Sequence, residues 1–244
     1  MNFKLEIIGF TIQGCMTAQA AGAHRIELCD NEAAGGTTPS YGFIKIARQQ
    51  LAIPLYPIIR PRGGNFCYSE AEIDIMKADI LQCKALGCEG VVLGILDSKG
   101  NVDKERCARF ISLAYPMEVT FHRAFDAVMD PAKSLEDIIS IGCERVLTSG
   151  GKATAAEGTA NIEALVKQAN SRIIIMPGSG IRAANILDIA QKTGATEFHS
   201  SAKTFLQSHQ QGHAAAASGA LHNVGADETE VRTMFQILSV HHTS

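Results

Sequence analysis

The chain has 244 residues, of which 46% are hydrophobic and 19% are charged, and this composition suits one sizeable domain with a filled core. Its 22 basic and 25 acidic side chains give a formal net charge of -3, which argues against nucleic acid or an anionic membrane as a partner. The amino-terminal sequence lacks the pattern of a signal peptide, and no apolar run is long enough for a membrane span. We therefore expect a cytoplasmic protein with a small-molecule ligand.

Apolar runs alternate with helical stretches along the chain. Four glycines, Gly22, Gly87, Gly142 and Gly194, each stand between a helical stretch and an apolar run, as is typical of helix C-caps. Each interval between them holds one further apolar run, so the repeating unit contains two strands. The expected strands are residues 4–8, a run ending at 29, residues 54–59, a run after 88, residues 118–121, a run ending at 148, residues 173–176 and a run through 197–201. Eight strands alternating with helices predict a single-domain (β/α)8 TIM barrel, with a doubly wound open sheet as the alternative.

The starts of the helices carry recognisable capping signals. Residues 69–72 read Ser-Glu-Ala-Glu, which is a capping box. Asp130-Pro131 and Thr38-Pro39 each read as an N-cap followed by proline in the first helical position. These signals support the alternation of helices with strands.

The chain changes character after the eighth expected strand. We assign residues 1–203 to the barrel and residues 204–244 to a C-terminal extension. Within the extension, residues 207–222 lack any period and predict a mobile loop. Asp227 and Glu230 then begin a last helix with an apolar face of Val231, Met234, Phe235 and Leu238. We expect this helix to pack on the barrel or at a subunit interface of a homo-oligomer, preferably a dimer.

Polar side chains gather where the expected strands end, which is where barrels of this kind build their active sites. Glu27, His122 and Asp126 are candidates for general acid/base catalysis, because burial and neighbouring charges can bring the pKa of a carboxyl or an imidazole towards neutrality. Their alternative role is purely structural, as members of an ion-pair lattice.

An anionic ligand is predicted by two separate stretches. Arg60 and Arg62 flank Pro61 directly after an apolar run, and arginine presents a fork of donors that suits carboxylate or phosphate. Backbone amides and hydroxyls also gather after the seventh and eighth strands, where such barrels commonly hold phosphate. The further candidates for anion binding are Arg123, Ser149, Gly178, Ser179, Gly180, His199 and Ser200.

The sequence lacks a Gly-x-Ser-x-Gly elbow, a Walker loop and a dinucleotide fingerprint, which disfavours acyl transfer and nucleotide use. Its seven cysteines include no Cys-x-x-Cys pair, and their odd number leaves at least one thiol free. We expect Cys15, Cys83, Cys88, Cys107 and Cys143 to pack in the core. Cys29 and Cys67 follow neighbouring strands and are the candidate ligands for Cu(I), the one cofactor considered; His209 and His213 could bind metal adventitiously.

Several segments in one order resemble the signatures of the CutC family of copper homeostasis proteins. They are residues 25–29, 35–40, 60–64, 121–126, 145–150 and 197–201. The resemblance implies a cytoplasmic, usually oligomeric barrel assigned to copper homeostasis, with copper bound through cysteines. Ile8 stands where many members of the family carry cysteine, and Asn65 stands where they often carry aspartate.

Two functions therefore remain in view. The resemblance implies a copper-handling protein, whereas the residues at the strand ends favour a TIM-barrel enzyme or binding protein for a small phosphorylated or carboxylated metabolite. A fold and a family name do not by themselves establish a reaction.

Overall fold

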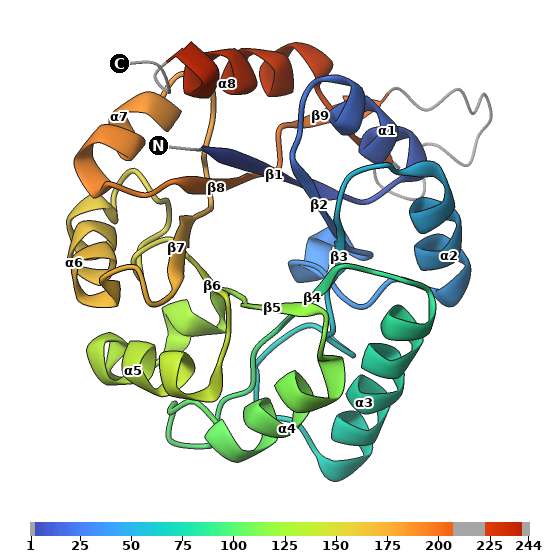
Figure 1. Cartoon of the computed structure of the whole chain (residues 1–244), viewed down its shortest axis with the longest axis vertical. Coiled ribbons are helices and arrows are strands. Elements are labelled where there is room, and N and C mark those ends of the chain that lie inside the picture. Colours follow the sequence, from blue (N-terminus) through green and yellow to red (C-terminus); the bar gives the residue numbers. More distant parts are fainter. Residues whose placement is uncertain (1–2, 207–222, 241–244) are drawn as a thin grey trace, which may run out of the picture.

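A ring of parallel strands surrounded by helices forms the molecule in the computed structural model (Figure 1). The structure describes residues 3–206 and 223–240. The barrel strands are β1 (Lys4–Gly9), β2 (Arg25–Leu28), β3 (Leu55–Pro57), β4 (Gly90–Leu93), β5 (Glu118–Phe121), β6 (Arg145–Thr148), β7 (Ile174–Pro177) and β8 (Glu197–Ser200). They pair in the orders β3-β2-β1-β8 and β4-β5-β6-β7.

Two joints close these half-sheets into a ring. Ile58 forms a parallel bridge with Val92, and the amide of Ile59 donates to the carbonyl of Val92 at 2.7 Å. On the other side β7 lies next to β8, without a regular ladder between them in the described part of the chain (Figure 1). The predicted (β/α)8 barrel is confirmed, and the open sheet is excluded.

The helices surround the ring in sequence order (Figure 1). They are α1 (Ile12–Ala20), α2 (Tyr41–Gln50), α3 (Glu70–Ala85), α4 (Lys104–Ala114), α5 (Pro131–Ile141), α6 (Thr159–Ala169) and α7 (Ile186–Thr193), with short 3₁₀ turns η1 (Glu32–Ala34) and η2 (Arg123–Ala127). No helix among the described residues is both long and apolar enough to cross a membrane.

The four glycines predicted as C-caps all have positive φ. Gly142 and Gly194 are the C-cap residues, whereas Gly22 and Gly87 come one residue after the C-cap.

The predicted N-caps are confirmed except for one. Ser69 and Glu72 form the capping box of α3, and Asp130 caps α5 with proline in the first turn. The prediction for Thr38 is wrong, because α2 begins later and has Ser40 as its N-cap. The hydroxyl of Thr38 instead accepts the backbone amide of Arg60 at 2.8 Å, so it joins two loops of the barrel mouth.

The C-terminal extension returns to the barrel. Strands β9 (Lys203–Leu206) and β10 (Asn223–Ala226) form an antiparallel pair, and α8 (Glu228–Val240) lies between α7 and α1 (Figure 1). Three predicted apolar residues of α8, Val231, Met234 and Leu238, are buried. The predicted mobile loop 207–222, with His209 and His213, lies outside the described residues.

The barrel interior contains charged residues where such barrels usually hold branched apolar ones. Strand periodicity explains their placement, because alternate residues of a strand face the same side. Arg25 and Glu27 therefore both face inward from β2, and Glu197 and His199 do so from β8. Ile26, Leu28 and Phe198 occupy the intervening positions and belong to the apolar core.

The lower interior charges pair with one another. Arg25 donates to Glu6 and, at 2.8 Å, to Glu197, which also accepts from Arg145 at 2.8 Å. Arg145 Nη2 lies 2.6 Å from the carboxylate of Glu118. Buried charges are tolerated only with such partners, so this network holds β1, β2, β6 and β8 in a fixed arrangement.

We predict that Glu197→Gln destabilises the barrel by about 3–5 kcal/mol, because it leaves Arg25 and Arg145 buried beside a neutral group. Chemical denaturation measures this change. The matched control is Glu228→Gln, which removes an exposed helical ion pair with Arg232 and is expected to change stability by less than about 0.5 kcal/mol. Equal, small effects of the two variants would contradict this account of the interior.

Candidate functional site

A cavity of about 540 Å³ opens at the carboxyl ends of the strands. Its polar lining includes Glu27, Arg60, His122, Arg123, Ser179, Gly180 and His199. Apolar side chains, among them Ile8, Phe66 and Leu147, complete the lining. A cavity of this size with a few convergent polar groups suits a small metabolite.

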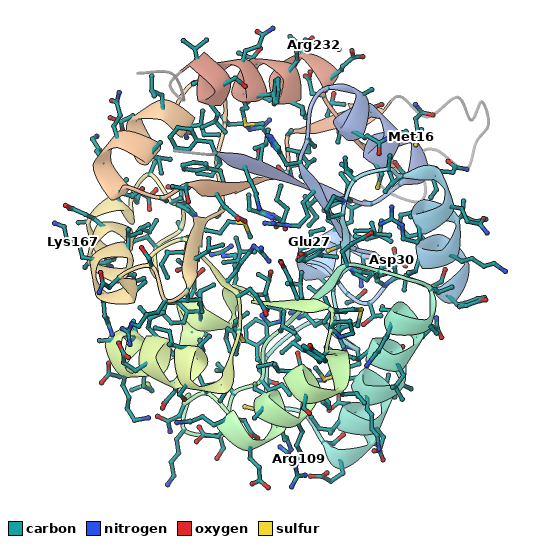
Figure 2. The ribbon with its side chains drawn as sticks, viewed as in Figure 1. Met16, Glu27, Asp30, Arg109, Lys167 and Arg232 are labelled. Atoms are coloured by element: carbon teal, nitrogen blue, oxygen red, sulfur yellow. The ribbon has the colours of Figure 1, made fainter. Side chains whose placement is uncertain are left out.

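Glu27 is the buried acid of the cavity, and it lies inside the ring of strands (Figure 2). Only 3% of it is exposed, yet its carboxyl receives no hydrogen bond from any described residue. Its nearest ionisable contact is His199 Nε2, 3.7 Å away. Burial raises the pKa of Glu27 to about 7, and nearby Glu6 adds to the rise, while His199 and Arg25 oppose it. Glu27 can therefore exchange a proton near neutral pH.

His199 connects Glu27 to a second carboxylate, Glu6. The Nδ1 atom of His199 lies 2.7 Å from Glu6 Oε1. Burial alone would raise the pKa of Glu6, but the ion pair with Arg25 and the hydrogen bond from His199 lower it to about 2. Burial would lower the pKa of His199, but its bond to Glu6 and the charge of Glu27 raise it. An ionised Glu6 thus orients a histidine whose other nitrogen faces Glu27.

Glu6, Glu27 and His199 are also close enough to offer ligand atoms to one metal ion, all within 4.8 Å. The oxygens of Glu6, however, already accept from Arg25 and His199. This occupation fits a hydrogen-bonded relay better than a cation site. The sequence predicts His199 as an anion ligand and does not predict Glu6. The register of β1 against β8 is what places Glu6 opposite His199.

His122 is almost fully buried, and its tautomer follows from its contacts. Nδ1 accepts the backbone amide of Ala124 at 3.1 Å, so Nε2 carries the hydrogen. Nε2 has no hydrogen-bond partner among the described residues. Burial, assisted by the charge of Arg60, lowers the pKa of His122 to about 3. The expected acid/base role is therefore a poor match, because the ring stays neutral at physiological pH.

Arg60 lines the cavity, but most of its donors hold the surrounding loops. Its Nη1 donates to the carbonyls of Ala34 and Gly36, both at 2.7 Å, and its Nη2 to that of Gly64 at 2.9 Å. The guanidinium lies over the ring of Phe66, and its Nε is buried without a hydrogen-bond partner among the described residues. Arg60 is thus chiefly a clamp between the loops after β2 and β3.

Arg62 does not belong to the cavity lining. Its Nε donates to Glu72 at 2.5 Å, and its guanidinium lies over the ring of Tyr68. The sequence predicts that Arg60 and Arg62 both bind an anionic ligand, with Pro61 between them. The structure directs the second one to the start of α3.

Asp126 also lies outside the cavity lining, and its hydrogen bonds explain its role. Its carboxylate accepts from the hydroxyl of Thr148 at 2.5 Å, from Ser149 and from the amide of Gly151 at 3.1 Å. It also accepts from Arg123 Nε at 2.7 Å. Asp126 therefore holds the loop after β6 and positions Arg123 on the cavity wall. The catalytic role expected for Asp126 stays a prediction, and its place outside the cavity lining lends that role no support.

Ser149 is completely buried and, like Asp126, helps to position Arg123. Its hydroxyl lies 3.0 Å from Arg123 Nη2, which donates to it. Arg123 keeps part of its side chain exposed and lines the cavity. Of the two residues, only Arg123 can contact a ligand there.

The loop after β7 presents backbone amides to the cavity. Ser179 and Gly180 both have positive φ, 75° and 73°, and both line the cavity. Their amides find no hydrogen-bond acceptor within residues 3–206 and 223–240. Consecutive free amides are suited to an anion, so anion binding at this loop stays a prediction.

Gly178 and Ser200, the other two residues predicted to bind an anion at the ends of β7 and β8, have structural contacts. A Cβ at Gly178 would lie 2.4 Å from Leu147 Cδ1, so a larger residue there would displace the side chain of Leu147. The hydroxyl of Ser200 donates to the carbonyl of Ile181 at 2.7 Å. Both keep the amides of Ser179 and Gly180 in place.

An ion pair that the sequence does not predict lies at the mouth of the cavity. Lys203 at the start of β9 lies with its Nζ 2.8 Å from Glu32 Oε1 in η1, and both line the cavity. No motif announces this pair, because it depends on how the C-terminal extension leaves β8.

Cys29 and Cys67 lie in different surroundings. Cys29 is completely buried at the cavity, and burial together with Glu27 and Glu6 raises the pKa of its thiol well above the usual range. Cys67 is half-buried, donates to the carbonyl of Asp97 at 3.1 Å and does not line the cavity. The other five cysteines are buried and free, which confirms their predicted packing role.

A family model and curated relatives match this chain in the same way. The model of the CutC family matches residues 3–204. A CutC family protein of Xylella fastidiosa is 45% identical over 240 residues, covering 96% of this chain and 88% of its own length. The human copper homeostasis protein cutC homolog is 46% identical over 203 residues, covering 83% of this chain and 74% of its own length.

A solved structure agrees with these sequence matches. The putative copper homeostasis protein CutC from Streptococcus agalactiae superposes with a TM-score of 0.78 at 38% identity, covering 82% of this chain and 98% of its own. The family match, the identities and the shared barrel lead to one conclusion, that this chain belongs to the CutC family.

Proposed function

We propose that this chain is an enzyme that binds a small phosphorylated or carboxylated metabolite at the barrel mouth and exchanges a proton with it through Glu27. The observation that carries the proposal is the carboxyl of Glu27, which is buried, receives no hydrogen bond from the described residues and lines the cavity. A buried polar group without a partner is costly. A ligand that hydrogen-bonds to Glu27 or exchanges a proton with it relieves that cost.

The cavity also supports an anionic substrate. Arg123, Lys203 and the amides of Ser179 and Gly180 lie in its lining. Amides and guanidinium groups recognise phosphate and carboxylate through charge-assisted hydrogen bonds. We assign the anionic end of the ligand to this side of the mouth.

Glu27 suits general acid/base catalysis because its raised pKa lies near the working pH. The imidazole of His199 is a second proton site next to Glu27. Its hydrogen bond to Glu6 holds the ring in one orientation. Their arrangement resembles the general scheme in which a base is oriented by a third group. The three residues therefore act on the ligand through Glu27.

Copper is the function named for the human and streptococcal relatives, so its fit to these residues matters. Cu(I) binds thiolates, whereas burial beside Glu27 and Glu6 keeps the thiol of Cys29 protonated. Cys67 does not share the cavity with it. Ile8, at the end of β1, offers no third thiol. The donor set does not fit a Cu(I) centre, and we derive no step through copper.

We predict weak Cu(I) binding at most in a titration against a competing chelator under reducing conditions, because forming a thiolate at Cys29 is unfavourable. The matched variant is Cys29→Ser combined with Cys67→Ser, which is expected to titrate like the wild type. Tight stoichiometric binding that disappears in this double variant would restore the copper function.

We predict that Glu27→Gln changes the pH dependence of stability. A carboxyl whose pKa is raised in the folded state favours folding at low pH and loses that advantage as pH rises from its unfolded value to about 7. The variant should therefore gain stability relative to the wild type between pH 5 and 8, by up to about 3 kcal/mol. Denaturation curves at several pH values measure this, and parallel pH profiles would show that Glu27 has an ordinary pKa.

We predict that anionic metabolites raise the melting temperature of the protein. A ligand at a hundredfold excess over Kd adds about 2.7 kcal/mol to the free energy of unfolding. Thermal unfolding with inorganic phosphate and with carboxylated and phosphorylated compounds of three to five carbons measures the effect.

Two variants assign that effect to the cavity. Arg123→Ala should remove most of the shift, whereas Arg109→Ala should keep it, because Arg109 lies on the outer surface and pairs with Glu105 (Figure 2). If no anion stabilises the wild type, or if both variants respond alike, the proposed binding site is wrong.

A further inference from the structure

The ring of His122 carries a donor that none of the described residues uses, and this donor defines the class of ligand. Resting on the proposed function, we infer that the substrate is a small anionic carbonyl compound. The Nε2–H of His122 binds its carbonyl oxygen, and Glu27 removes a proton from the carbon next to that carbonyl. The reaction class is enolisation, the first step of an isomerisation or epimerisation.

The tautomer of His122 is fixed by the backbone. The amide of Ala124 donates to Nδ1 at 3.1 Å, which leaves the hydrogen on Nε2. Nε2 is buried and has no partner among the described residues, although the ring lines the cavity. Buried donors are almost always satisfied in folded proteins. The missing partner is therefore a hydrogen-bond acceptor that arrives with the ligand.

The surroundings keep the ring neutral and fix its position. The charge of Arg60 and the burial of the ring both oppose a second proton, and Phe66 packs against it with ring centres 5.0 Å apart. Gly94 makes room, because a side chain there would approach Cε1 and Nδ1 to 2.6 Å. A neutral donor held in an apolar wall stabilises a developing oxyanion strongly, because it needs no rearrangement during the reaction.

Glu27 and His122 line the same cavity from different sides of the barrel, at the ends of β2 and β5 (Figure 1). A ligand between them meets a base on one side and a hydrogen-bond donor on the other. Arg123 follows His122 directly and, with the amides of Ser179 and Gly180, takes the anionic end. The cavity thus offers three separate contacts to a substrate with an acidic C–H bond, a carbonyl and an anion.

The proposed step is balanced without any further reactant. The carboxylate of Glu27 accepts the proton from carbon, the C–H electron pair forms the C=C bond, and the π pair of the carbonyl moves onto oxygen. The resulting enolate oxygen keeps its hydrogen bond from His122. Glu27 then returns the proton, or a solvent proton in its place, to carbon. No oxidant or reductant takes part.

Exchange of C–H for deuterium in D₂O, followed by proton NMR, tests the inference directly. The probes are 2-oxo acids and keto- and aldose phosphates of three to five carbons, each paired with its carbonyl-free alcohol, such as pyruvate with lactate and dihydroxyacetone phosphate with glycerol 3-phosphate. We expect at least one carbonyl probe to bind tenfold or more tightly than its alcohol and to exchange. Glu27→Gln should abolish exchange while the probe still raises the melting temperature.

The outcomes separate this inference from the proposed function. If carbonyl probes and alcohols bind equally and neither exchanges, the anion site stands and the carbonyl inference is wrong. If no probe binds, both are wrong. Exchange that persists in Glu27→Gln also overturns the assignment of the base.

Two measurements isolate the donor of His122. His122→Phe should slow exchange ~100-fold, and His122→Gln, which restores an N–H donor, should recover part of the rate. Long-range ¹H–¹⁵N NMR of the wild type, which needs no variant to fold, should show a neutral Nε2–H ring from pH 5 to 8. A ring that becomes cationic in that range, or that carries its hydrogen on Nδ1, would overturn the inference.

Discussion

The pairing of Arg25 with Glu6 and Glu197 is the constraint on which the rest of the site depends. Strand periodicity places Arg25 and Glu27 on the same inward face of β2, but the guanidinium donates to the two carboxylates of β1 and β8. Glu27 therefore faces the cavity without a hydrogen-bonded cation. The paired charges below hold the barrel together, and the carboxyl of Glu27 above them, which accepts no hydrogen bond from the described residues, has a pKa of about 7.

The same division between satisfied and unsatisfied groups runs around the barrel mouth. Arg60 and Asp126 have most of their hydrogen-bonding capacity engaged by loop carbonyls, amides and hydroxyls, so they shape the cavity. The Nε2–H of His122 and the amides of Ser179 and Gly180 have no such partners in the described structure. The groups left without partners are those that a ligand can contact.

The sequence was sufficient to predict the barrel and the neighbourhood of its site, because apolar runs, capping residues and polar strand ends are local signals. It could not separate Glu27 and His122 from Asp126, since all three lie at or shortly after the end of a strand, and only the loop after β6 shows that the carboxylate of Asp126 is already hydrogen-bonded. Glu6 lies within β1, away from any strand end, and only the register with β8 brings it to His199. The N-cap of α2 was likewise ambiguous in the sequence, because Thr38 and Ser40 are both of residue types that cap helices. The hydroxyl of Thr38 accepts a hydrogen bond from the amide of Arg60 instead.

The central claim is that the carboxyl of Glu27 is buried at the cavity, accepts no hydrogen bond from the described residues and titrates near neutrality. Direct ¹³C NMR titration of the glutamate side-chain carboxyls, with Glu27→Gln used to assign the signal, tests this most directly. The account predicts one glutamate signal that titrates near pH 7 in the wild type and is missing from the variant. A Glu27 signal that titrates below about pH 5, as an ordinary glutamate does, would contradict it.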